Sequence, residues 1–127
     1  MLSRRRRIAS DLTSYKRDLL WAVHRANHTE EEETPVGADV KRELEALGQT
    51  NTEGGQFYPR LNELVDSGLA TKDDHPNDAR GFTVELTEDG KAILSELVLR
   101  TAESLDMDVP ECALPSSDVR PRTRGET

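Results

Sequence analysis

Gln56 and Arg60 carry the side chains whose types and spacing most clearly suggest binding chemistry. They are four residues apart, so on a helix they lie on the same face. A glutamine amide and an arginine guanidinium both hydrogen-bond to base edges, and the guanidinium also pairs with phosphate. If the segment is helical, this pair predicts a contact with nucleic acid.

Residues that would indicate catalysis or metal binding form no recognisable pattern. Gly54-Gly55 is too short for a phosphate-binding glycine loop, and no Walker-type lysine accompanies it. His24 and His28 have the i, i+4 spacing of half a metal site, but no suitable third ligand lies nearby, which favours a solvated pair. No nucleophile and base are arranged as in a hydrolase site. The sequence therefore predicts a protein that is not an enzyme and that has no cofactor and no metal site.

An amphipathic helix is predicted around the first two residues named above. Its apolar residues have the i, i+4, i+7, i+8 spacing of one buried stripe, at Phe57, Leu61, Leu64 and Val65. Thr52 is the expected N-cap, and Gly68 is the expected left-handed residue that ends the helix. Pro59 lacks a backbone N–H, so the helix either begins near Gly55 or bends there.

A second amphipathic helix is predicted just before this one. Its apolar positions are Val36, Val40, Leu44 and Leu47. Gly48 is its expected end, and residues 49–51 form a short turn into the next helix. Helix, tight turn and helix is the helix-turn-helix arrangement, in which the first helix braces the second across a DNA groove. Lys41 and Arg42 lie on the bracing helix and are expected to contact DNA.

The first core helix is predicted to begin at Asp11 or Thr13 and to end near His28. Its apolar stripe consists of Leu12, Tyr15, Leu19, Leu20 and Val23. Trp21 lies off this stripe, so it is either exposed or packed on a second surface such as a partner chain.

A β-hairpin is predicted after Gly68. Residues 69–72 and 81–86 form its strands, and Phe82, Val84 and Leu86 alternate onto one side. Residues 73–80 contain turn-forming types and connect the strands. Two strands that follow a recognition helix form a wing, so Arg80 is a candidate for a phosphate or groove contact. Alternatively, Arg80 pairs with one of the neighbouring aspartates.

The last helix is predicted to extend from about Thr87 to Leu105, with Thr87 as its N-cap. Its apolar residues exceed what a small domain needs to cover its own core. We therefore expect it to form a dimer interface, together with Trp21, through Leu94, Leu97, Val98, Thr101 and Leu105. The alternative is a helix that packs only on its own domain.

Two segments resemble a known family. Gly55-Gln56-Phe57-Tyr58-Pro59-Arg60-Leu61, followed by Leu64, Gly68 and Leu69, is similar to the signature of PadR-like winged-helix transcription regulators. Leu86-Thr87, followed by Gly90, also resembles their pattern after the wing. The resemblance covers about residues 12–100. It implies a mainly α-helical winged helix-turn-helix with a small β-hairpin, and a long C-terminal dimerisation helix.

The charge of the chain is unusual for a DNA-binding protein. A net charge of −8 over 127 residues contrasts with the basic surface that such proteins usually carry. However, the chain has only four lysines against 13 arginines, with 25 acidic residues, a balance that resembles proteins of salt-loving archaea. We therefore interpret the acidity as an adaptation to salt, with salt cations as possible bound partners. With the family resemblance, it points to an oxidant-responsive regulator of such archaea.

The two ends of the chain fall outside the resemblance. Arg4, Arg5, Arg6 and Arg7 form a basic run within a predicted arm over residues 1–10, which is either a solvated disordered segment or one that orders on DNA. Residues 106–127 are rich in proline, serine and charge, so we expect a disordered tail. Cys112 lies in this tail as the single cysteine, which excludes a disulfide within one chain and fits a cytoplasmic protein. Neither a membrane span nor a signal peptide is expected.

These features predict a domain order of arm (1–10), winged helix-turn-helix (11–86), dimerisation helix (87–105) and tail (106–127). The favoured function is a homodimeric, sequence-specific transcription regulator that binds double-stranded DNA, with the recognition helix in the major groove and the wing on the backbone or minor groove. The alternative is an acidic winged helix that binds a protein partner and never touches DNA. The residues expected to contact DNA are Arg4, Arg5, Arg6, Arg7, Lys41, Arg42, Thr52, Gln56, Tyr58, Arg60 and Arg80.

Overall fold

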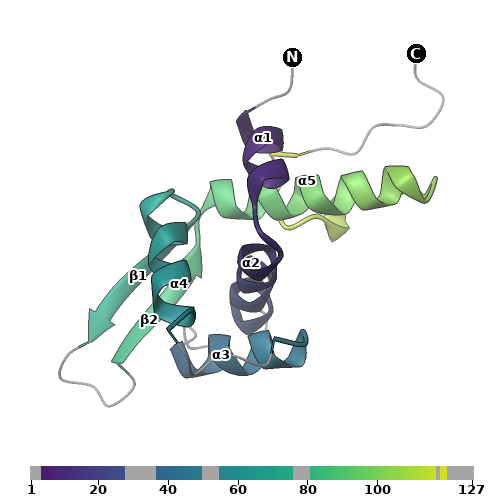
Figure 1. The fold of residues 1–127 in the computed structure, drawn as a ribbon. Coiled ribbons are helices and arrows are strands. Elements are labelled where there is room, and N and C mark those ends of the chain that lie inside the picture. Colours follow the sequence, from purple (N-terminus) through teal and green to yellow (C-terminus); the bar gives the residue numbers. More distant parts are fainter. Residues whose placement is uncertain (1–3, 28–36, 50–54, 76–80, 117, 120–127) are drawn as a thin grey trace.

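The structure is a computed structural model, and it describes residues 4–27, 37–49, 55–75, 81–116 and 118–119. Its elements, in chain order, are α1 (Arg4–Asp11), α2 (Ser14–Asn27), α3 (Gly37–Ala46), α4 (Phe57–Asp66), β1 (Ala70–His75), β2 (Gly81–Leu86), α5 (Glu88–Ser104) and the short 3-10 helix η1 (Glu111–Ala113). Helices α3 and α4 both pack on α2 beside the β1–β2 hairpin, and α5 runs across the end of α2 that lies away from α3, next to α1 (Figure 1). This arrangement confirms the predicted winged-helix fold.

The core forms where the apolar stripes of these elements meet. Leu19, Leu20 and Val23 of α2 are fully buried, together with Phe57 and Leu61 of α4. The predicted stripes of α2 and α4 are therefore confirmed, and of the two predicted starts of α2 the structure has the one at Thr13, whose Oγ1 accepts from Lys16 N at 3.3 Å. Burial of each such side chain stabilises the fold by about 1.5–3 kcal/mol relative to exposure.

Helix α4 begins at Phe57, with Gln56 at its N-cap position, and its first backbone bond joins Arg60 N to Gln56 O at 3.0 Å. Pro59 therefore lies in the first turn, where its missing N–H removes no bond within the helix. This agrees with a start near Gly55 and excludes a bend at Pro59. The predicted N-cap Thr52 lies outside the described residues.

Gly68 ends α4 as predicted. It has a φ of +79°, a left-handed conformation that suits glycine. The backbone of the next residue hydrogen-bonds back to α4, because Leu69 N donates to Leu64 O at 3.0 Å. The chain then enters β1.

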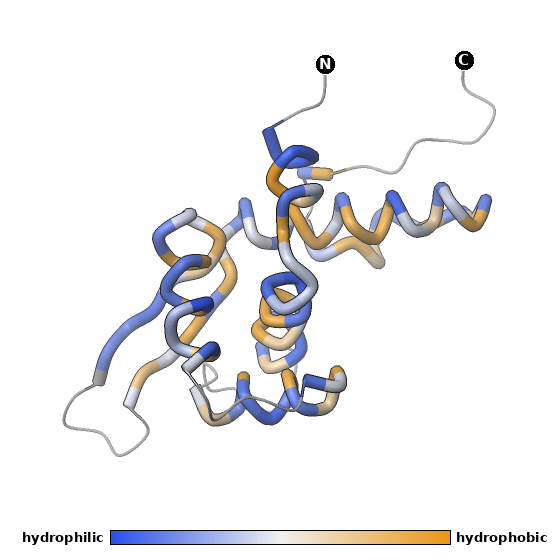
Figure 2. The backbone as a smooth tube through the Cα atoms, in the orientation of Figure 1, coloured by the Kyte–Doolittle hydropathy of each residue, from blue (hydrophilic) through white to orange (hydrophobic). Residues whose placement is uncertain are grey.

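The hairpin has the expected alternation. β1 and β2 are antiparallel, with Ala70 opposite Leu86 and His75 opposite Gly81. Phe82, Val84 and Leu86 of β2 face the core, whereas β1 is hydrophilic along most of its length (Figure 2). β1 extends to His75, further than the strand predicted over residues 69–72. The tip, with Arg80, lies outside the described residues.

Helix α5 is joined closely to the end of α4. Thr87 is the N-cap as predicted, and its Oγ1 accepts from Gly90 N at 3.1 Å and donates to Gly68 O at 2.6 Å. Thr87 N also donates to Leu69 O at 3.1 Å. Gly90 lies directly against the Leu69 carbonyl, which leaves no room for a side chain.

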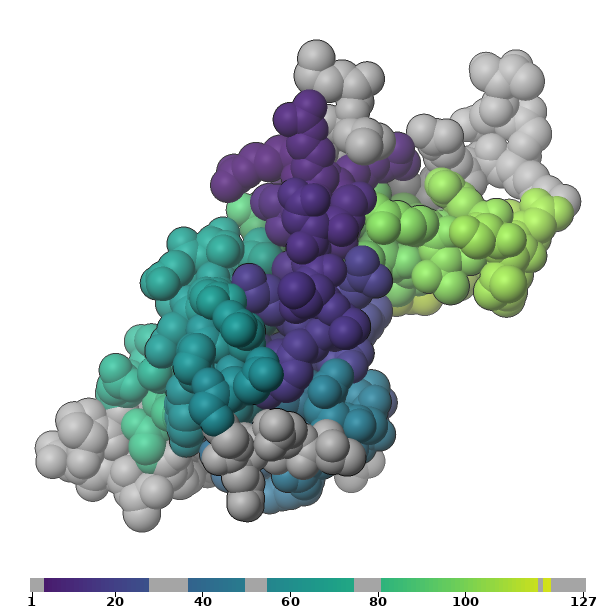
Figure 3. All heavy atoms as spheres, viewed as in Figure 1, coloured from purple at the N-terminus to yellow at the C-terminus, as the bar shows by residue number. Residues whose placement is uncertain are grey.

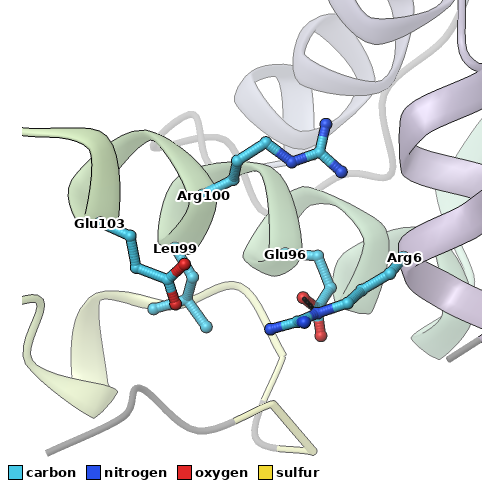
Figure 4. A pocket seen from close by; sticks show the side chains of 5 residues that line it. All are labelled: Arg6, Glu96, Leu99, Arg100 and Glu103. Atoms are coloured by element: carbon cyan, nitrogen blue, oxygen red, sulfur yellow. Dashed lines mark hydrogen bonds and ion pairs between the residues drawn. The ribbon is translucent and has the colours of Figure 1, made fainter. Parts of the chain in front are cut away.

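The N-terminal segment differs from the predicted arm. Residues 4–11 form helix α1, which packs on α5 through Ile8 and the buried Ala9. Arg5 pairs with Asp89 at 3.2 Å, and Arg6 pairs with Glu96 of α5 at 3.3 Å (Figure 4). Half of the basic run therefore contacts carboxylates within its own chain.

The C-terminal segment also differs from the disordered tail that was predicted. After α5 the chain reverses at Asp106 (φ 55°), and its described part folds back along the helix. Leu114 and Val119 pack on Ala92 of α5. Ser116 N donates to the buried Ser95 Oγ at 3.0 Å. We call the described residues of this segment, 106–116 and 118–119, the C-terminal strap.

An ion-pair chain connects α2 to α4. Lys16 Nζ lies 2.8 Å from Glu63 Oε2, and Arg60 Nη1 lies 2.5 Å from Glu63 Oε1. The hydrogen bond from Lys16 is the main cause that lowers the pKa of the Glu63 carboxyl; desolvation opposes it, and the charge of Arg60 lowers the pKa further.

The Gly90 contact yields a stability prediction. Gly90→Ala places a methyl group on the Leu69 carbonyl, so the α4–α5 junction must shift, at a cost of about 1–3 kcal/mol. Chemical denaturation at constant salt measures the loss. Gly55→Ala is the matched control, because its methyl group meets nothing within 4 Å, and it should change stability by less than about 0.5 kcal/mol. Equal stability of the two variants would contradict the packing described.

A pH prediction follows from Glu63. Because its pKa is lowered in the folded state, ionised Glu63 stabilises the fold above the ordinary glutamate pKa of 4.5, and this contribution is lost as the pH falls through the folded-state value. The stability difference between wild type and Glu63→Gln should therefore be present near neutral pH and shrink below about pH 4.5. Denaturation across this range measures it. Lys16→Met should show the same trend, and a difference that is constant with pH would rule out the ion pair as its source.

Candidate nucleic-acid interface

The outer face of α4 is the surface opposite its buried stripe. Phe57, Leu61 and Leu64 face the core, which leaves the other side of the helix to solvent. Helix α4 lies uncovered at the front of Figure 3, beside the hairpin. The exposed residues at this surface are Gln56, Tyr58, Pro59, Asn62 and Asp66.

Gln56 and Asn62 give this face hydrogen-bonding groups that can read bases. Both are exposed, and an asparagine or glutamine amide can donate to and accept from adenine in the major groove. The sequence reasoning identified Gln56 but missed Asn62. The sequence pattern did indicate that Asn62 is exposed, because Asn62 follows the buried Leu61 and lies roughly opposite the apolar stripe of α4.

Arg60 lies at the edge of this face rather than at its centre. Its guanidinium is held by Glu63, on the side where α4 meets the start of α2. Burial raises the pKa of the Tyr15 hydroxyl on α2, and the nearby charge of Arg60 opposes that shift. A contact between Arg60 and DNA would therefore require the guanidinium to exchange Glu63 for a base or phosphate.

Lys41 of α3 lies against the aromatic residues that begin α4. Its Nζ is 4.8 Å from the Tyr58 ring centroid and 5.1 Å from the Phe57 ring centroid. It also donates to the Tyr58 hydroxyl at 3.5 Å. The structure thus brings together two predicted site residues, Lys41 and Tyr58.

Both strands of the wing, β1 and β2, add residues to the same group of rings. Phe82 makes an edge contact with Tyr58, with ring centroids 5.9 Å apart. Lys72 of β1 lies over the other side of the cluster, 4.7 Å from the Phe82 centroid. We call Lys41, Phe57, Tyr58, Phe82 and Lys72 the lysine–aromatic cluster.

Most cations around this interface already have a carboxylate partner. Arg42 pairs with Asp39 at 3.5 Å, Arg25 with Glu43 at 2.8 Å, and Lys72 with Asp74 at 3.7 Å. Among the described residues from α2 to β2, Lys41 and Arg17 are the cations without an ion pair. Of these, Lys41 borders the exposed face of α4, so its charge is available to an external anion.

The four arginines of the basic run are not brought to this face. Arg4, Arg5, Arg6 and Arg7 lie on α1, at the end of the molecule opposite α3 and the open end of the hairpin (Figure 1). Thr52 and Arg80 lie outside the described residues. The roles of Arg4 to Arg7, Thr52 and Arg80 in DNA binding stay predictions.

Five of the six predicted dimer residues line one apolar groove. It has a volume of about 410 Å³ and lies between α2, α5 and the C-terminal strap. Its lining residues are Trp21, Leu97, Val98, Thr101, Ala102, Leu105, Met107 and Val109. Leu94 is the exception. It is fully buried in the core of its own domain, so its placement on the dimer surface was wrong.

The described residues offer no other binding chemistry of the kinds considered. They contain no group of three or more residues suited to holding a metal ion. His24 packs edge-on against Trp21, with ring centroids 5.8 Å apart, and His28 lies outside the described residues. None of the described helices combines the length and apolar character needed to cross a membrane. Cys112 is exposed on η1.

Comparison with known proteins identifies a relative. No family model and no curated protein matches the sequence. Among solved structures, H. salinarum RosR, from crystals grown in NaBr, is similar to this chain. The two are 30% identical with a TM-score of 0.60, and the match covers 80% of this chain and 84% of that one. This level of identity over most of both chains shows common descent as well as a common fold. The chain belongs to the RosR family.

Proposed function

We propose that the chain is a homodimeric transcription regulator that binds double-stranded DNA in a sequence-specific manner. The observation that carries this proposal is the outer face of α4, where exposed amide side chains stand beside a wing in a fold shared with RosR. In this arrangement α4 enters the major groove, α3 braces it, and the hairpin lies along the backbone or minor groove.

The candidate contacts divide by chemistry. Gln56 and Asn62 would read bases, while Lys41 and Tyr58 would anchor on phosphate next to the same groove. Arg60 would join them after leaving Glu63. We also propose Thr52, Arg42 and Arg80 as DNA contacts. Arg4 to Arg7 lie on α1, so we propose them only as contacts to DNA that extends beyond the outer face of α4.

Dimerisation would occur through the groove beside α5. The C-terminal half of α5 extends past α2 in Figure 1, and Leu105 and Met107 are 63% and 61% exposed. Large apolar side chains gathered at one exposed groove favour a protein–protein contact. A two-fold dimer would present two α4 helices to successive major grooves, about one helical turn of DNA apart.

Salt would enter the binding equilibrium in an unusual way. Ordinary DNA-binding proteins lose affinity with added salt, because cations are released from DNA. Here Glu63 and Asp66 lie on the helix that approaches the phosphates, so cations taken up by these carboxylates would flatten or reverse that dependence. Together with the acidic composition, this fits a regulator from a salt-loving archaeon, as does a relative from H. salinarum. The PadR-like subtype and a role in the stress response are parts of the same proposal.

The alternative is a protein-binding winged helix that uses its acidic surface. It is favoured by the same Glu63 and Asp66, and by the carboxylate that already holds Arg60. A basic partner protein, rather than DNA, would then cover α4. Selective binding of DNA by the purified protein would exclude this alternative.

The reading face yields the first functional prediction. Gln56→Ala together with Arg60→Ala should weaken binding to a preferred duplex by about tenfold or more, because a good base contact contributes about 1–3 kcal/mol of discrimination. Fluorescence anisotropy in molar potassium salt and at low salt measures this, with scrambled DNA as the reference. Arg100→Ala on α5 is the control. Unchanged specific affinity of the double variant would show that the reading face is misassigned.

The groove yields a prediction on assembly. Leu105→Glu places a charge in the apolar groove and should convert a dimer into a monomer, which sedimentation measures. Ser104→Glu is the matched control, since it adds the same charge at an exposed neighbour that does not line the groove. A Leu105→Glu variant that still sediments as a dimer would place the interface elsewhere.

A further inference from the structure

The lysine–aromatic cluster joins the three parts of the interface that would have to meet DNA together. Lys41 comes from α3, Tyr58 from the start of the recognition helix, and Phe82 from the wing strand β2. The Tyr58 ring lies edge-on to both Phe57 and Phe82, at centroid distances of 5.1 Å and 5.9 Å. Edge-on pairs of this kind attract each other beyond the area that they bury.

Phe82 is the residue through which these parts are connected. The tip of its ring lies where a side chain at Gly37 would be, so the ring rests against the first residue of α3. Its edge contact reaches Tyr58 of α4, and Lys72 of β1 lies 4.7 Å from its centroid. One side chain therefore contacts α3, α4 and both strands of the wing.

Tyr58 depends on these contacts because little else restrains it. Its side chain is 47% exposed, and its hydroxyl meets only Lys41 Nζ at 3.5 Å among the described residues. Without Phe82, one of the two rings that flank Tyr58 is lost. The ring would then turn more freely, and Lys41 would lose a fixed aromatic face under its ammonium group.

We propose that Phe82 is a positioning residue for DNA recognition: its ring sets where Tyr58 and Lys41 meet the phosphate backbone, so that α3, α4 and the wing bind as one surface. This inference rests on the proposed function. It adds that the wing contributes to affinity through the placement of α3 and α4, and not only through its own contact with DNA.

The physical connection can be measured without DNA. The chain has four lysines, so protein labelled with ¹³C-lysine gives four sets of side-chain signals. Ring currents should shift the Lys41 and Lys72 signals away from those of Lys16 and Lys91. Phe82→Leu should remove the shift of Lys72 and also alter that of Lys41, whose cation–π contacts among the described residues are to Phe57 and Tyr58. An unchanged Lys41 signal would overturn the positioning role.

Val84→Ala is the matched control for stability. Val84 is fully buried on the same strand and the same face, but its carbonyl meets Asn27 of α2 at 3.5 Å rather than the cluster. The substitution should destabilise the fold by an amount comparable to Phe82→Leu and leave the Lys41 and Lys72 signals in place. It thereby separates loss of core packing from loss of positioning.

The DNA test uses a duplex that the wild-type protein selects from a randomised library. Phe82→Leu should weaken binding about tenfold, and Val84→Ala less than about twofold, at a temperature where both variants are folded. Tyr58→Leu with Phe82→Leu should bind no more weakly than Tyr58→Leu alone, because the effect of Phe82 passes through Tyr58.

The outcomes distinguish the two levels of the proposal. Equal losses for Phe82→Leu and Val84→Ala, or additive losses in the double variant, would overturn the positioning role while leaving DNA binding intact. If the wild-type protein selects no duplex, the proposed function fails, and the positioning role for DNA falls with it.

Discussion

The joint between the end of α4 and the start of α5 is the constraint on which the rest of the structure depends. Gly68 turns the chain out of α4, and the Thr87 hydroxyl donates to its carbonyl at 2.6 Å. Thr87 N donates to Leu69 O. Gly90 has no side chain, so the Leu69 carbonyl lies directly against the first turn of α5. The end of the recognition helix, both ends of the hairpin and the start of α5 are thereby fixed relative to one another.

This junction between α4 and α5 also explains how a small core can fix the orientation of the exposed face of α4. The side chains of α4 that face inward are few, so the direction of the helix is set largely by its two ends. The C-terminal end is held by the Thr87 and Leu69 contacts, and the N-terminal end by Phe57 and the rings around it. Between them, the Lys16–Glu63 pair fixes the side that faces α2. What remains free is the outer face with Gln56 and Asn62.

Most elements of this fold could be predicted from the sequence, because their apolar residues repeat with the period of the element. The stripe of α4, the stop at Gly68 and the alternation of Phe82, Val84 and Leu86 all depend on near neighbours in the chain. Helix α1 was missed for the opposite reason. Four arginines mask its short apolar face, and the helix is held by Asp89 and Glu96, more than 80 residues away.

In the candidate site, too, features set by near neighbours in the chain could be predicted, and features set by contacts between distant residues could not. Which arc of α5 faces its own domain depends on three-dimensional packing. Leu94, Leu97 and Leu105 were all predicted at a dimer interface, but Leu94 is buried in its own domain, whereas Leu97 and Leu105 line the groove. The C-terminal strap was missed because the Ser116–Ser95 hydrogen bond joins residues 21 positions apart in a segment without periodicity. Spacing placed Arg60 on the same face as Gln56, but it could not show that Glu63, which also pairs with Lys16 of another helix, holds the guanidinium at the edge of that face.

The burial of α5 shows why its remaining apolar surface matters. Helix α1 packs against it, Ile93 and Leu94 enter the main core, and Ala92 is covered by the strap. The strap then contributes Met107 and Val109 to the groove instead of covering Leu97 and Leu105. Leu97 and Leu105 therefore share one groove with Trp21, and this clustering of large apolar side chains supports the proposed dimer contact.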